Sequence, residues 1–388
     1  MSAETSLDPD SIIAEARART GLEDLGDPSF EEPMRRLVAS MDSEGQLHEV
    51  GRATQRERVV GLLVNRLRAE AAFTRHPEIE EEEIEAPFVI VGLARTGTTM
   101  LHRTISADPR VFTLYWWEGR HPAPFEGASA GVDPRIEAAE AEVAAMVEAV
   151  PELVAAHPFD AHAPDEEIML LEHSFFSTNT EAYVEIPSYS GWLDQQNQIP
   201  GYTYMHRILK LLQWQKKQRG ERAKRWVLKS PHHLGYMDLL FKTFPDIRVI
   251  QTHRDPVQTI PSFSSLVHSI RKTGSDRVDA VRLGRQWSDR MCRAMESCME
   301  FRRSREERFF DIRYEDLIAD PMTQIQKIYD FVEMELTEDV KSRMQQWAVE
   351  NARDKRPVHY YTLEQFGYTE EGLAREFARY RERFGVGK

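Results

Sequence analysis

The sequence PFVIVGLARTGTTM, residues Pro87–Met100, decides the fold of this 388-residue chain. Its first half is apolar and ends at Gly92, which is typical of a buried strand, and the pattern MLHRTI that begins at Met100 is typical of a helix. The glycines and threonines between them indicate a tight loop. A strand–loop–helix unit of this kind directs several backbone N–H groups and the positive end of a helix dipole toward one point. The stretch therefore predicts a binding site for an anion such as a phosphate.

The spacing of this loop is that of the nucleotide-binding P-loop with one change. Thr98 stands where a P-loop has the lysine that contacts the terminal phosphates, and the cation is Arg95, inside the loop. A nucleoside triphosphatase also needs an acidic residue at a strand end to hold Mg²⁺. The next strong strand pattern, Ile247–Thr252, is followed by His253 and Arg254 instead. The loop thus favours an anion other than a magnesium-bound triphosphate, although a P-loop kinase or NTPase and a non-catalytic nucleotide-binding protein stay as alternatives.

A second segment predicts a second anion site. In Asp246–Leu266, with the sequence DIRVIQTHRDPVQTIPSFSSL, a strand pattern is again followed by a turn and a helix. Asp255 and Pro256 suit the N-cap and first turn of that helix. Arg254 follows the strand, and Ser262 lies eight residues further on. A guanidinium group and a nearby hydroxyl are suited to bind one phosphate together, with the guanidinium bidentate.

These segments resemble the sulfotransferases that use 3′-phosphoadenosine 5′-phosphosulfate (PAPS), in particular their broad bacterial-type group. A third segment, Phe309–Pro321 with the sequence FFDIRYEDLIADP, extends the resemblance, which runs from Ala86 to Phe384. It implies that the glycine loop holds the 5′-phosphosulfate, that an arginine and a serine eight residues apart hold the 3′-phosphate, and that a tyrosine contacts the adenine. The residues implied in PAPS binding are Arg95, Thr96, Gly97, Thr98, Thr99, Arg254, Ser262 and Tyr314.

The chain departs from the family pattern at two places. Met100 stands where animal cytosolic members have a tryptophan against the adenine. The C-terminal loop that binds the 3′-phosphate in those enzymes has no literal copy, and the basic, aromatic segment Arg353–Phe366 is its candidate replacement. Within this segment we take Arg356 as a candidate ligand of the 3′-phosphate, with a basic surface cluster as the alternative.

The resemblance implies an enzyme that transfers the sulfuryl group of PAPS to a hydroxyl of a small, partly apolar acceptor. Because the acceptor oxygen attacks sulfur in line, the enzyme must position both molecules, neutralise charge on the sulfonyl and leaving oxygens, and remove a proton. Arg95 and Lys229 are the candidate cations. Lys229 lies in Trp226–His233, WVLKSPHH, which is similar to a family strand end where a lysine and a histidine flank the sulfonate. A buried lysine paired with a carboxylate is the alternative for Lys229.

Two residues are candidates for the catalytic base. Glu118 ends the sequence FTLYWWE, and some sulfotransferase branches use a glutamate at about this distance after the glycine loop. Desolvation beside Trp116 and Trp117 would favour proton uptake by its carboxylate near neutral pH. His232 is the second candidate, from the lysine–histidine resemblance, and its alternative is a structural histidine. We expect Glu118 to be the base ahead of His232.

Many aromatic residues, such as Trp117, Phe159 and Trp192, fall in regions that would face the cleft. If some of them line the acceptor pocket, the acceptor carries an apolar or ring-shaped body with a hydroxyl, such as a lipid, polyketide or glycolipid. A carbohydrate stacked on tryptophan is a further option. The 13 histidines show no metal-binding spacing such as HExxH, so we predict no metal.

Composition limits the partners and the compartment. The net charge of −14 argues against nucleic acid as a partner and implies that local positive groups capture an anionic cofactor. Cys292 and Cys298 lie in one helical stretch on different faces, which favours a reducing compartment. No apolar run approaches the ~18 residues of a membrane span, and the N-terminus has no apolar signal core. We therefore expect a cytoplasmic protein, and the sequence leaves its oligomeric state open.

The breaks in the pattern predict two regions. Residues 1–85 form an N-terminal helical region, and residues 86–388 form a sulfotransferase α/β domain with a helical insertion at about 119–215. We expect a P-loop-like three-layer fold around a mainly five-stranded parallel sheet, with ligands beyond the carboxyl ends of the strands. The expected strands are Phe88–Val91, Val111–Leu114, Arg225–Leu228, Ile247–Thr252 and Phe309–Ile312, and the expected N-terminal helices are Asp10–Thr20, Phe30–Met41 and Arg52–Phe73.

Overall fold

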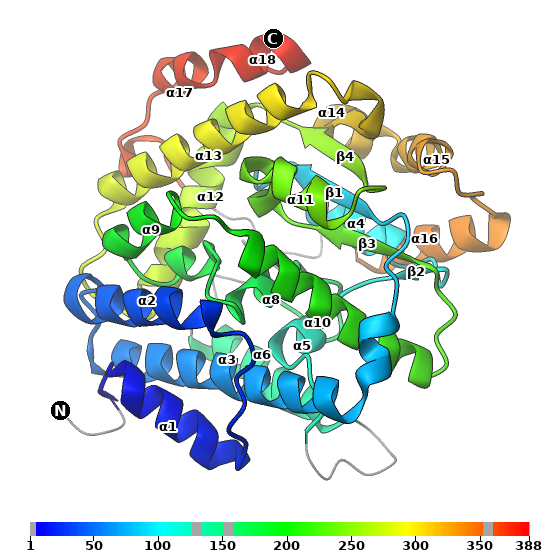
Figure 1. Ribbon diagram of the computed structural model, residues 1–388. Coiled ribbons are helices and arrows are strands. Elements are labelled where there is room, and N and C mark those ends of the chain that lie inside the picture. The colour runs from blue at the N-terminus through cyan, green and yellow to red at the C-terminus, as the bar shows by residue number, and fades with distance from the viewer. Residues whose placement is uncertain (1–4, 126–132, 150–158, 352–359, 388) are drawn as a thin grey trace.

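A parallel β-sheet forms the centre of the protein, as a computed structural model that describes residues 5–125, 133–149, 159–351 and 360–387 shows (Figure 1). The sheet has five strands in the order β2-β3-β1-β4-β5, and every pair of neighbours is parallel. The prediction of a five-stranded parallel sheet is confirmed. The strands are β1 (Phe88–Gly92), β2 (Val111–Phe112), β3 (Arg225–Lys229), β4 (Arg248–His253) and β5 (Phe309–Arg313).

Helices cover both faces of the sheet, because the strands are apolar on both sides. Along β1, Phe88 and Ile90 belong to one hydrophobic cluster, and Val89 and Val91 belong to another on the opposite face. The three layers of the predicted P-loop-like fold follow from this alternation. The first cluster includes residues of α4 (Thr98–Ile105), α15 (Pro321–Phe331) and α16 (Glu338–Glu350); the second includes residues of α10 (Ile199–Gln218), α11 (Met237–Thr243), α12 (Pro256–Arg271) and α13 (Ala280–Arg302).

The N-terminal helices share a third hydrophobic cluster with the insertion. Leu63 of the N-terminal region and Phe175, Tyr189 and Leu193 of the insertion are buried together in it. In Figure 1 the insertion helices (green) lie between the N-terminal helices (blue) and the sheet. The division of the chain at residue 85 stays a prediction, but the two regions pack as one body here. The helices are α1 (Pro9–Thr20), α2 (Glu31–Glu44) and α3 (Glu49–Arg75), then α6 (Pro134–Ala149), α8 (Ile168–Glu172) and α9 (Pro187–Leu193).

The remaining elements are short. They connect the layers or close the C-terminal end of the described chain (Figure 1). The α-helices among them are α5 (Trp116–Arg120), α14 (Tyr314–Ala319), α17 (Glu370–Glu376) and α18 (Ala378–Phe384), and the 3₁₀ helices are η2 (Pro28–Phe30), η3 (Pro77–Glu81), η4 (Asn179–Ala182), η5 (Pro231–Gly235), η6 (Glu306–Arg308) and η8 (Glu364–Phe366).

The second strand is shorter than predicted. Pairing with β3 stops at Phe112, and the chain turns into α5 from Trp116 onward. The Glu118 carboxylate accepts a hydrogen bond from the Tyr115 N–H, which satisfies a donor at the start of this helix. Glu118 therefore lies on a helix, whereas the sequence predicted it at a strand tip.

None of the helices that the structure describes is both long and apolar enough to cross a membrane. Nor do the described residues bring together three or more histidine, cysteine or acidic side chains that could hold a metal ion.

The shared cluster makes a stability prediction. Leu63 on α3 is fully buried, whereas Val50 on the same helix is 67% exposed. We expect Leu63→Ala to lower the free energy of unfolding by about 2–5 kcal/mol, through lost transfer energy and the cavity left behind. Val50→Ala should change it by less than about 0.5 kcal/mol. Urea unfolding followed by circular dichroism measures both variants, and equal effects would contradict the shared cluster.

Candidate functional site

The glycine loop after β1 has the backbone geometry of an anion site. Arg95 and Gly97 both adopt the left-handed region, with φ of 73° and 88°. Thr96 is buried and donates to or accepts from Thr252 across 2.6 Å, which ties the loop to β4. A Cβ at Gly97 would lie 3.1 Å from Cδ2 of Tyr314, so only glycine suits both the backbone and the space. The loop leads into α4, whose first residues are Thr98 and Thr99.

The second predicted anion site adjoins the first. Arg254 Nη1 donates to the backbone oxygen of Arg95 at 3.1 Å, and Arg95 Nε donates to Ser262 Oγ at 3.3 Å. The guanidinium carbon of Arg254 lies 4.1 Å from the centre of the Tyr314 ring. Four predicted cofactor ligands from three separate segments thus meet in one cluster. We call Arg95, Arg254, Ser262 and Tyr314 the arginine cluster.

Lys229 ends β3 and belongs to the same edge of the sheet. Its Nζ donates to Glu166 Oε1 at 2.5 Å and lies 3.5 Å from Thr99 Oγ1. Burial raises the pKa of Glu166, while the charge of Lys229 opposes that rise. The lysine thus lies beside the glycine loop and is buried in a pair with a carboxylate, while its role as a catalytic cation stays a prediction.

A cavity of about 430 Å³ begins at the glycine loop. Arg95, Thr98 and Thr99 line one end of it, and Glu166, Ser230 and His232 line its side. The rest of the wall is mostly apolar and includes Trp116, Ile168, Phe263, Leu266, Trp287 and Met291. This size and lining are typical of a pocket for a small organic molecule.

His232 of η5 has one ring nitrogen in use. Its Nδ1 lies 2.9 Å from Thr178 Oγ1, and its Nε2 is buried with no hydrogen-bond partner among the described residues. The ring stacks on Tyr236 at 4.5 Å between centroids. Burial, with smaller contributions from His233 and Arg290, lowers the pKa of His232 well below its usual value. The ring is therefore neutral at pH 7 and retains one nitrogen for a further hydrogen bond.

Comparison with known proteins identifies the family to which the chain belongs. A model of the Sulfotransferase family matches residues 87–339, which include both predicted anion sites and Lys229. The chain belongs to the sulfotransferase family. The kinase and non-catalytic alternatives are thereby set aside, because the family consists of enzymes that transfer a sulfuryl group.

Mycobacterial proteins are similar to this sulfotransferase over most of its length. The crystal structure of sulfotransferase STF1 from Mycobacterium tuberculosis has 30% identity and a TM-score of 0.82, and covers 95% of this chain and 98% of its own. Sulfotransferase STF9 from Mycobacterium avium has 27% identity and a TM-score of 0.86, with 97% and 96% covered. Omega-hydroxy-beta-dihydromenaquinone-9 sulfotransferase Stf3 of Mycobacterium bovis is 25% identical over 311 residues, which are 76% of this chain and 75% of that protein.

Glu118, the base expected first, lies away from the other predicted site residues. Its carboxylate is fully buried, 2.8 Å from Lys216 Nζ and 2.7 Å from Arg219 Nη2, and it is not among the described residues that line the cavity. Lys216 is fully buried as well. Since two cations and a backbone N–H occupy the carboxylate, this placement favours a structural role for Glu118 in the sulfotransferase, and its role as the base stays a prediction.

The other predicted site residues are placed as follows. The arginine cluster, the glycine loop, Lys229 and His232 come together at one edge of the sheet, as described above, whereas Arg356 lies outside the described residues. Sequence reasoning missed Glu166 and Thr178. A pair of adjacent carboxylates, Glu166 and Glu167, before an apolar run was the signal for the first. The second had no signal, because Thr178 and His232 are 54 residues apart in sequence.

The buried ion pair of Glu118 makes a second prediction. We expect Glu118→Gln to lower the free energy of unfolding by about 3–5 kcal/mol, because it leaves the buried Lys216 charge uncompensated. The folded fraction should keep its turnover number. Thermal denaturation and kinetics at low temperature measure these effects, and Glu140→Gln, at an exposed carboxylate, is the matched control. A stable Glu118→Gln protein without turnover would restore Glu118 as the base.

Proposed function

We propose that this sulfotransferase takes its sulfuryl group from PAPS and transfers it to a hydroxyl of a partly apolar acceptor in the cavity. The arginine cluster is the observation that carries the proposal. It joins the glycine loop to a second candidate phosphate site, Arg254 and Ser262. A nucleotide with phosphates on both the 3′ and the 5′ position of its ribose requires two such sites. A magnesium-dependent kinase needs only one phosphate site, because its nucleotide carries phosphates only on the 5′ position.

The residues present fit PAPS. The left-handed turn at Arg95 and Gly97 and the first residues of α4 suit the 5′-phosphosulfate. Arg254 and Ser262 suit the 3′-phosphate, because a guanidinium and a hydroxyl supply charge-assisted hydrogen bonds. The Tyr314 ring, which packs on Arg254, offers an aromatic contact for the adenine. When bound, PAPS supplies the activated sulfuryl group.

Positive and donor groups gather where charge develops during transfer. Arg95, Thr98 and Thr99 line the end of the cavity at the glycine loop, and Lys229 Nζ is next to Thr99. Preorganised donors at such a place stabilise the sulfonyl and leaving oxygens more in a buried site than in water. Glu166 holds the lysine in position and balances its charge.

Of the two candidate bases, the geometry supports His232 better than Glu118. It lines the cavity, its ring is neutral, and its Nε2 lacks a partner among the described residues. A neutral imidazole accepts a proton from a positioned hydroxyl as that oxygen attacks. A substrate hydroxyl would complete the hydrogen bonding of this nitrogen.

The apolar wall of the cavity favours a lipid-like acceptor over a carbohydrate. Hydrophobic side chains such as Leu266, Trp287 and Met291 bury an apolar body, and they offer few groups for the many hydroxyls of a sugar. The name of the relative Stf3 supports this class, since it describes sulfation of a hydroxylated menaquinone.

The donor site makes a binding prediction. We expect adenosine 3′,5′-bisphosphate, the product of PAPS, to bind about 10- to 100-fold more weakly to Arg254→Ala than to the native protein, because charge-assisted hydrogen bonds to a phosphate are lost. Isothermal titration calorimetry measures this difference. Arg36→Ala, at an exposed arginine on α2, is the control and should bind normally. Tighter binding of Mg-ATP than of the bisphosphate would refute the proposed donor.

The base makes a kinetic prediction. With PAPS and a hydroxylated isoprenoid quinone, His232→Ala should lower kcat by about 10²- to 10⁴-fold, the usual share of general base catalysis. The base acts in its unprotonated form, and burial lowers the pKa of His232. The kcat/KM of the native enzyme should therefore stay level as the pH falls to about 6.5, the usual histidine pKa, and should decline only at lower pH.

The rival base is Glu166, which also lines the cavity and has a raised pKa. If His232→Ala keeps its turnover number while Glu166→Gln loses it, the carboxylate is the base. If kcat/KM of the native enzyme begins to fall while the pH is still above about 6.5, the usual histidine pKa, that result also contradicts His232 as the base.

A further inference from the structure

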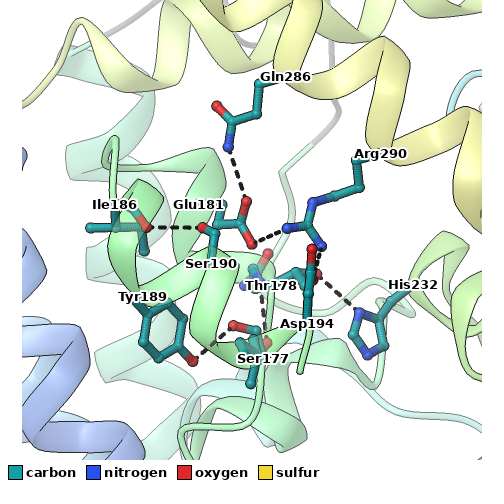
Figure 2. A network of polar contacts seen from close by, with 12 residues as sticks. Ser177, Thr178, Glu181, Ile186, Tyr189, Ser190, Asp194, His232, Gln286 and Arg290 are labelled. Atoms are coloured by element: carbon teal, nitrogen blue, oxygen red, sulfur yellow. Dashed lines mark hydrogen bonds and ion pairs between the residues drawn. The ribbon is translucent and has the colours of Figure 1, made fainter. Parts of the chain in front are cut away.

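The two nitrogens of the His232 ring have different surroundings. Figure 2 shows the contact of Nδ1 with Thr178, at 2.9 Å, whereas Nε2 has no hydrogen-bond partner among the described residues. Tyr236 stacks on the ring, and Tyr202 lies 6.4 Å from it between centroids. The hydrogen bond between the Thr178 hydroxyl and Nδ1 therefore distinguishes the two nitrogens of the ring.

This hydrogen bond selects the tautomer of the ring. A neutral imidazole carries one proton, on either Nδ1 or Nε2. A proton on Nε2 would be a buried N–H without an acceptor, and such donors are rare in folded proteins. A proton on Nδ1 is donated to Thr178 Oγ1 and leaves a lone pair on Nε2. Unpaired buried acceptors are found more often than unpaired buried N–H donors, and a substrate hydroxyl would satisfy this one.

The position of Thr178 is itself held by α13. Its backbone oxygen accepts from the N–H of Glu181 at 3.1 Å, at the start of η4. The Glu181 carboxylate is fully buried and lies 3.0 Å from both Arg290 Nη2 and Gln286 Nε2, as Figure 2 shows. On the other side, the Tyr189 hydroxyl donates to the backbone oxygen of Ser177 at 3.3 Å. The threonine therefore sits on an anchored turn.

We propose that Thr178 is a positioning residue: its hydroxyl accepts a hydrogen bond from the Nδ1–H of His232 and so keeps Nε2 unprotonated for the substrate hydroxyl. The inference rests on the proposed role of His232 as the base. Thr178, Asn179 and Ala182 also line the cavity, so the turn that bounds the acceptor also orients the base. Binding of the acceptor and removal of its proton thus depend on the same turn of the insertion, the one that carries Thr178.

The charged and titratable groups around the ring agree with this role. They are His233 on η5, Tyr236 at the start of α11, Tyr202 on α10 and Arg290 on α13. None of these four is a carboxylate, and His233 and Arg290 both oppose a positive charge on the ring. A neutral hydroxyl therefore sets the tautomer, where many enzymes use an aspartate.

Nitrogen-15 NMR of histidine-labelled protein tests the inference without a substrate. We expect the His232 signals, assigned with His232→Gln, to show a protonated Nδ1 and an unprotonated Nε2. Thr178→Val should move the proton toward Nε2, and Thr178→Ser should retain the native pattern. Thr180→Val, at a buried threonine two residues away that contacts Glu172, is the matched control and should leave the pattern unchanged. A native ring protonated on Nε2 overturns the inference, whether or not the valine variant folds.

Kinetics with two acceptors give a second test. Toward a hydroxylated isoprenoid quinone, Thr178→Val should lower kcat by about 10- to 100-fold, as outer partners of a reacting group usually do, with little change in KM. Thr178→Ser should restore the rate. Toward p-nitrophenolate, which has no proton to remove, the loss in Thr178→Val should be much smaller than with the quinone. An equal loss with both acceptors would show a purely structural role and overturn the inference.

His232→Ala separates this inference from the proposed function. If His232→Ala keeps the native rate with the quinone alcohol, the proposed base is wrong and the role of Thr178 falls with it. If His232→Ala loses the rate and Thr178→Val retains it, the base stands and only the positioning role is refuted.

Discussion

The hydrogen bond from Arg254 to the backbone oxygen of Arg95 is the interaction on which the site depends. It joins the loops that follow β1 and β4, strands that run parallel and pair from Phe88 with Arg248 to Gly92 with Thr252. Because parallel neighbours end at the same edge, both loops emerge side by side. The bond uses one guanidinium nitrogen of Arg254 and the backbone oxygen of Arg95, a residue in the left-handed region. It thereby holds two groups of positive charge together that would otherwise repel each other.

Local charge, not the field of the whole protein, prepares this sulfotransferase for an anionic donor. The chain carries a net charge of −14, so the proposed nucleotide donor, with its several negative charges, would be captured only where arginine and lysine gather. The arginine cluster and Lys229 form such a place, and Glu166 balances the lysine. The same balance operates at Glu118, whose charge pairs with the buried Lys216 and the partly exposed Arg219. One carboxylate faces the cavity and the other supports the scaffold.

The N-terminal helices contribute to the site indirectly. They share a hydrophobic cluster with Phe175, Phe176 and Tyr189, which flank the turn that carries Thr178. The turn is held from one side by this cluster and from the other by the Glu181–Arg290 ion pair (Figure 2). Support from two layers restricts the turn to one geometry, which a positioning role for its threonine requires.

The sequence by itself determined the parallel sheet, the glycine loop and the arginine–serine pair, because these depend on local patterns of polarity, glycine and short spacing. It could not tell where the Glu118 side chain lies, since a glutamate after a strand has the same local pattern whether it faces the cavity or, as here, a buried Lys216. Only the tertiary structure decided that Thr178 meets His232 and that Glu166 meets Lys229. Each pair joins residues more than fifty positions apart, and no local pattern encodes a contact that the packing of two distant segments creates.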